Sequence, residues 1–99
     1  MEIGFLRQAQ DNRETAKRKR NLAKHGLDLA DAGAVLEGRC LERIDDRRDF
    51  GEERWISIGM LGGQIVVCIW VERGEAARII SLRKADKDEQ EDYLKTFFR

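Results

Sequence analysis

The longest uncharged apolar stretch of the chain spans residues 64–71, and runs without alternation are typical of a central strand covered on both faces. Residues 55–58 and 77–83 are strand-like, and 40–44 shows a looser alternation. Glycines at 62–63 and 74 indicate hairpin turns between these segments. The pattern therefore predicts an antiparallel sheet of three to four strands.

Helical periodicity precedes and follows this sheet. The first helix is expected from Asp11, whose spacing to Glu14 is close to a capping box, to about His25, where Gly26 ends it. A second helix follows Asp28 and ends near Gly38. Residues 3–6 are compatible with either a strand or an extension of the first helix.

The last helix is expected after Asp86, which again stands three residues before a glutamate, Glu89. Its apolar positions share one face: Tyr93, Leu94, Phe97 and Phe98. The order of elements predicts an α+β fold with two N-terminal helices, an antiparallel three- to four-stranded sheet and a C-terminal helix. Ninety-nine residues fit a single domain, 1–99.

Charge is the feature of the composition that bears most on function. Nineteen basic and nineteen acidic residues cancel, so the overall field does not favour nucleic acid. An RNA-binding role therefore requires local segregation of charge. The basic run 17–20 with Lys24, against the acidic stretch 86–92, offers such segregation. Four consecutive residues point around a helix, so at most two of the run can face one groove, and a solvated helix face is the simpler interpretation.

Several classes of protein are disfavoured. Cys40 and Cys68 lack the paired spacing of a zinc site, and a buried reduced thiol is expected for Cys68. The acidic cluster within 45–53 has no ligand-loop spacing, so a solvated turn is favoured over a metal site. We expect no metal or other cofactor, no signal peptide, no membrane span and a cytoplasmic location.

Candidate chemistry gathers near the last strand. Arg78 precedes its apolar centre and Arg83 and Lys84 follow it, and a guanidinium suits phosphate through two parallel hydrogen bonds. Positions 78 and 83 differ by an odd number, so in a regular strand the two arginines face opposite ways. Only a bulge would bring them to one face.

His25 is the only histidine and the only side chain with an ordinary pKa near neutrality. At a helix C-terminus the dipole favours its protonated form, which suits a general acid or phosphate binder better than a base. The alternative is a capping role, in which the ring satisfies the last helical carbonyls.

The order of these segments resembles the BrnT family of bacterial type II toxins, small ribonucleases with a RelE-like fold. The resemblance covers about residues 17–98. Residues 1–16 depart from it, because Arg13 and Glu14 stand where the family has an aromatic-x-Trp-Asp sequence. The matching positions are Asn21, Lys24-His25-Gly26, Glu53-Arg54, Gly59, the strand ending at Trp70, Arg78-Ile79-Ile80-Ser81, Arg83, Ala85 and Tyr93.

The resemblance implies a metal-independent endoribonuclease that cleaves mRNA and inhibits growth, with His25, Arg54 and Arg83 as catalytic residues. It implies RNA contacts by Lys24, Arg78, Lys84 and Tyr93. Arg54 could instead form a cross-strand ion pair with Glu72 or Glu53, of small energetic value if exposed. The apolar stripe of the last helix favours core packing for Tyr93. Trp55 and Trp70 could stack on nucleobases, although the place of Trp70 in the apolar strand favours the core.

The resemblance also implies a BrnA-like antitoxin with a ribbon-helix-helix DNA-binding part, so that DNA is contacted only through the antitoxin. The alternative function is a non-catalytic α+β binding module for a protein or nucleic acid. Zero net charge and the unmatched residues 1–16 favour this alternative. Substitution of the arginines distinguishes the two functions: a toxin should lose growth inhibition and keep its fold, whereas a binding module should have no growth effect to lose.

Overall fold

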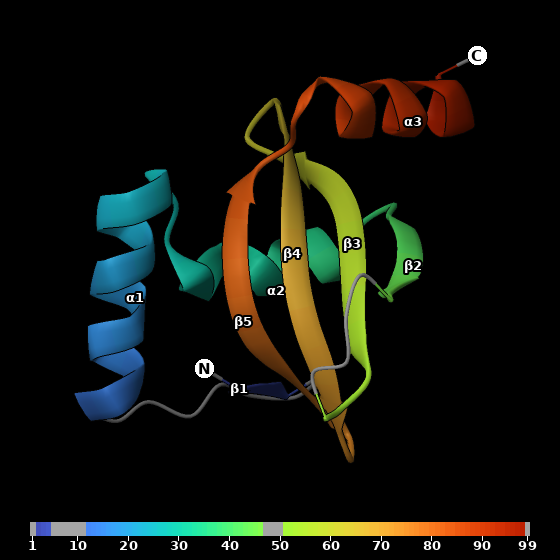
Figure 1. The fold of residues 1–99 in the computed structure, drawn as a ribbon. Helices are drawn as coiled ribbons and strands as arrows, with labels where there is room; N and C mark the ends of the chain where they lie inside the picture. The colour runs from blue at the N-terminus through green and yellow to red at the C-terminus, as the bar shows by residue number, and fades with distance from the viewer. Residues whose placement is uncertain (1, 5–11, 47–50, 99) are drawn as a thin grey trace.

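The computed structural model describes residues 2–4, 12–46 and 51–98 (Figure 1). The predicted capping residue Asp11 lies outside them. The elements, in chain order, are β1 (Glu2–Gly4), α1 (Asn12–His25), the 3₁₀ turn η1 (Leu29–Asp31), α2 (Ala32–Glu37), β2 (Leu41–Asp45), β3 (Arg54–Leu61), β4 (Gln64–Arg73), β5 (Ala76–Lys84) and α3 (Lys87–Phe97).

The strands form one antiparallel sheet in the order β1-β5-β4-β3-β2. The predicted α+β fold is confirmed, and β2 to β5 form the expected meander. The short strand β1 pairs with the beginning of β5, which resolves the choice left open near the N-terminus in favour of a strand. Figure 1 shows α1 beside β5, α2 across one face of the sheet and α3 at one end of the sheet.

A bulge interrupts the pairing of β4 with β5. Ile69 lies opposite Ser81 and Trp70 opposite Ile79, so Ile80 is the extra residue. Beyond the bulge Arg83 lies opposite Val67, and before it Arg78 lies opposite Val71. Two residues four apart on β4 share a face, so both arginines belong to the same face of the sheet. The bulge therefore explains how two arginines at an odd spacing lie on the same face.

Each face of the sheet has its own core. On the side of α2, η1 and α2 pack on β4 and β5 through residues that include Leu29, Val35 and Leu82. On the side of α3, Ile58 and Val67 pack with Tyr93. The helix α3 has its expected capping box, but its apolar face is only partly used, because Leu94 and Phe98 are 43% and 62% exposed.

Gly59 allows α2 to approach β3 closely. A Cβ atom at this position would lie 3.0 Å from Cγ1 of Val35 and 3.2 Å from Sγ of Cys40. Cys68 is fully buried and reduced, as predicted, and burial raises the pKa of its thiol to about 12. Burial also raises the pKa of the Cys40 thiol, to about 11, so both thiols are protonated near pH 7.

The buried amide of Asn21 joins α1 to the edge of β5. Its Oδ1 accepts from the N–H of Leu82 at 3.2 Å, and its Nδ2 donates to the carbonyl oxygens of Leu82 at 2.8 Å and Leu27 at 2.7 Å. Since β1 pairs only with residues 76–78, the amide takes the place of a neighbouring strand at Leu82. It satisfies backbone groups that would otherwise be buried without partners.

Replacing Asn21 by alanine should lower the free energy of unfolding by about 2–4 kcal/mol, because three buried backbone groups lose their partner. Lys19→Ala, an exposed change on the same helix, should alter it by less than about 0.5 kcal/mol. Urea denaturation measures both. An Asn21→Ala variant as stable as Lys19→Ala would contradict the role given to the amide.

Candidate active site

A groove with a volume of about 310 Å³ lies between α1 and β5. Its helical residues are three or four positions apart, so they form one face of α1. Within the basic run 17–20, Lys17 and Arg20 line the groove, in keeping with the limit of two set by helical geometry. The lining residues are Lys17, Arg20, Asn21, Lys24, His25, Leu29, Ile80 and Ser81.

Arg18 points away from the groove and holds the connection between α1 and η1. Its Nε and Nη2 each donate to a carboxylate oxygen of Asp28 at 2.8 Å. Asp28 also caps η1 by accepting from the N–H of Ala30 at 3.0 Å, and its pKa is lowered to about 2, chiefly by the hydrogen bond from Arg18. This ion pair holds the segment between α1 and η1 in place.

His25 is the last residue of α1 and is partly buried at the side of the groove. Its pKa lies below the ordinary 6.5 because burial disfavours the charged ring, and the positive charges of Lys24 and Arg83 add to the effect. The expectation that the helix dipole would favour protonation is therefore wrong in direction, because burial and two nearby cations outweigh the dipole. A neutral imidazole near pH 7 can accept a proton.

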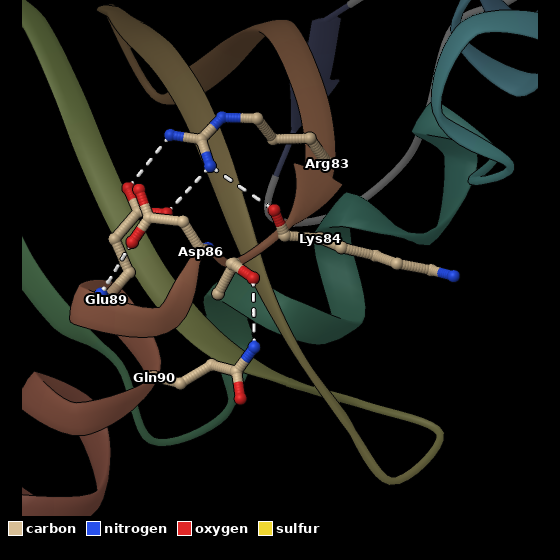
Figure 2. A network of polar contacts seen from close by, with 6 residues as sticks. Arg83, Lys84, Asp86, Glu89 and Gln90 are labelled. Carbon is tan, nitrogen blue, oxygen red and sulfur yellow. Dashed lines mark hydrogen bonds and ion pairs between the residues drawn. The ribbon is translucent and has the colours of Figure 1, made fainter.

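Arg83 lies at the end of β5, and its positive charge acts on His25. Figure 2 shows its guanidinium facing Glu89 of α3, with Nη1 and Nη2 donating to the two carboxylate oxygens at 2.7 and 2.8 Å. Nη1 also donates to the carbonyl oxygen of Lys84 at 3.3 Å. Glu89 is 7% exposed, and the hydrogen bond from Arg83 lowers its pKa. Arg83 thus anchors α3 and contributes charge near the imidazole.

The carboxylate of Glu89 also completes the capping box of α3. It accepts from the N–H of Asp86 at 2.9 Å, while Asp86 accepts from the N–H of Glu89 at 2.8 Å (Figure 2). One buried carboxylate therefore fixes both the start of the helix and the guanidinium of Arg83.

Of the predicted site residues, Lys24 and His25 line the groove. Arg83 is not among the lining residues, but it lies near enough for its charge to act on His25. The other predicted residues also lie outside the groove. Arg54 opens β3 and lies opposite Asp45 of β2, with β4 between β3 and β5. Arg78 lies beside Glu2 near the other end of β5 from Arg83.

The two remaining candidates have different surroundings. Lys84 is exposed at the end of β5. Tyr93 is only 3% exposed, and its hydroxyl donates to the carbonyl oxygen of Arg39 at 3.2 Å, so the favoured core position is confirmed. Its predicted RNA contact stays a prediction.

Six of the lining residues are not among the site residues predicted from the sequence: Lys17, Arg20, Asn21, Leu29, Ile80 and Ser81. Lys17 and Arg20 could have been recognised by their helical spacing to Lys24. Asn21, Ile80 and Ser81 are matching positions of the family resemblance, which assigns them no role. Among the residues that the structure describes, no group of three or more histidine, cysteine, aspartate or glutamate side chains is arranged to hold a metal ion.

Comparison of the sequence with protein families gives a match over most of the chain. A family model described as "Ribonuclease toxin, BrnT, of type II toxin-antitoxin system" matches residues 14–89, well over half of the chain. The chain belongs to the BrnT family. Members of this family are ribonuclease toxins and are paired with an antitoxin. The match includes most of α1, all the residues that line the groove and the whole of β5, and ends at Glu89.

No curated protein matches the chain significantly. Within the described residues of this BrnT protein, we find no helix with the length and apolar character needed to cross a membrane.

The pKa of His25 can be measured directly, because the chain has a single histidine. An NMR titration of its imidazole should give a midpoint below 6.5. Lys24→Gln removes one of the two nearby cations and should raise the midpoint, whereas Lys19→Gln should leave it unchanged. A wild-type midpoint at or above 6.5 would contradict the effect of burial.

Proposed function

We propose that this BrnT protein is a metal-independent endoribonuclease toxin in which His25 is the general base. One observation carries the proposal: a groove lined by basic side chains contains the single imidazole of the chain, and its pKa is lowered by burial and by two nearby cations. Such a base is available at neutral pH, next to charges that can attract a phosphate.

The proposed reaction uses the 2′-hydroxyl of the RNA as nucleophile. His25 takes the proton of this hydroxyl as its oxygen attacks the adjacent phosphorus. Arg83 stabilises the negative charge that develops on the phosphorane. The bond to the 5′-oxygen breaks, and Lys24 supplies the proton that this leaving group requires. The products are a 2′,3′-cyclic phosphate and a 5′-hydroxyl end, and no metal ion takes part.

Lys17, Arg20 and Lys24 are proposed to hold the RNA backbone along the groove. Because the chain has no net charge, attraction for RNA comes from these few contacts and not from a general field. A catalytic role of Arg54 stays a prediction, as do RNA contacts by Arg78, Lys84 and Tyr93.

Cleavage of a defined mRNA in the presence of EDTA tests the proposal. The wild-type protein should produce ends carrying cyclic phosphate, and a 2′-O-methyl version of the same RNA should remain intact because it lacks the nucleophile. His25→Ala should lower the rate by roughly 10²–10⁴-fold, the usual contribution of a general base. No cleavage with EDTA, with magnesium or with ribosomes would reject the enzyme and favour a non-catalytic binding module.

The two roles of Arg83 can be separated by breaking its ion pair from either side. Arg83→Ala and Glu89→Ala both remove the bidentate contact with α3, so both should lower the free energy of unfolding. Only Arg83→Ala should also lower the rate of cleavage, by roughly 10²–10³-fold if the guanidinium stabilises the phosphorane. Equal losses of activity in the two variants at a temperature where both are folded would show that Arg83 acts only by anchoring α3.

We further propose that the substrate in the cell is mRNA in the cytoplasm and that a BrnA-like ribbon-helix-helix antitoxin neutralises the toxin. In that arrangement DNA is contacted only through the antitoxin. Exposed apolar side chains, Leu22 on α1 and Leu94 on α3, support a protein partner.

A further inference from the structure

A second pocket, of about 170 Å³, lies away from the groove and is lined by Glu42 of β2, Trp55 of β3, and Trp70 and Glu72 of β4. The indole rings are nearly parallel, with an angle of 21° and 6.0 Å between their centroids. Trp55 and Trp70 lie opposite each other on the two strands, and the stacked pair forms one wall of the pocket, called here the tryptophan wall.

Partly buried hydrogen bonds hold this wall in place. Nε1 of Trp70 donates to Oγ of Ser57 at 2.8 Å, and Ser57 donates to Oε2 of Glu42 at 2.8 Å. Ser57 is fully buried. The relay therefore fixes the ring of Trp70 and the carboxylate of Glu42 before any ligand arrives, which lowers the entropic cost of binding.

The charge of the pocket is negative. Glu42 and Glu72 are exposed at its margins, and no cation pairs with either within the part of the chain that the structure describes. Aromatic faces attract cations, and carboxylates add to this attraction. Two carboxylates repel phosphate, so an RNA base stacked on this wall would bring its backbone into an unfavourable field.

We propose that this pocket binds an arginine side chain of a protein partner, and that the antitoxin implied by membership of the BrnT family supplies it. A planar guanidinium can stack on the indoles while its N–H groups donate to a carboxylate. The pocket is smaller than the roughly 300–1,000 Å³ of small-molecule sites, which fits a single side chain. The identification of the partner as the antitoxin rests on membership of the family. The binding of an arginine by the pocket does not depend on ribonuclease activity.

The pocket is lined by both tryptophans of the chain, so their two indole N–H signals in NMR spectra report on it. Titration with the peptide acetyl-Gly-Arg-Gly-amide should shift these signals. The citrulline peptide has nearly the same shape without the charge and should bind at least about tenfold more weakly. Glu42→Gln/Glu72→Gln should lose the arginine response, whereas Glu37→Gln/Glu91→Gln, at exposed acids elsewhere, should keep it.

Equal responses to the arginine and citrulline peptides, or indole shifts with an RNA oligonucleotide but not with the arginine peptide, would overturn the proposal. If the double variant does not fold, Glu72→Gln alone decides, because Glu72 takes no part in the relay from Trp70 to Glu42. In the complex with the antitoxin, acrylamide should quench the tryptophan fluorescence less than in the free chain. Unchanged quenching would exclude the antitoxin as the source.

Discussion

The side-chain amide of Asn21 is the contact on which the groove depends. It pairs with both backbone groups of Leu82 and with the carbonyl of Leu27, so it fixes α1 against the edge of β5 that β1 leaves uncovered. The walls of the groove are this helix and this strand. The distance of Lys24 and His25 from β5 is therefore set by a buried amide that does no chemistry itself.

Arg83 combines a structural and an electrostatic function. Its bidentate contact with the buried carboxylate of Glu89 holds α3 to the end of β5, while its charge adds to the burial and to the charge of Lys24 that lower the pKa of His25. A guanidinium held in this way is pre-organised, since its orientation is fixed before RNA binds. The same contact limits its freedom to turn toward a phosphate, so stability and catalysis compete for one side chain.

Local patterns predicted much of the fold, because strands, hairpin glycines and capping boxes are encoded by neighbouring residues. The bulge at Ile80 and the pairing of β1 depend on contacts between distant segments, so the sequence offered them only as possibilities. The pKa of His25 was predicted in the wrong direction for a similar reason. The helix terminus is visible in the sequence, whereas burial and the approach of Arg83 exist only in the folded chain.

The net charge of zero results from regions of opposite charge on different parts of the surface. Basic side chains gather between α1 and β5, whereas two carboxylates frame the tryptophan wall on β2, β3 and β4. A polyanion is drawn to the first site and repelled from the second, and a basic peptide meets the reverse pattern. One small domain can therefore present separate surfaces to RNA and to a protein. A partner held by an arginine at the tryptophan wall need not compete with RNA for the groove, so neutralisation of the toxin would require a further contact on α1 or α3.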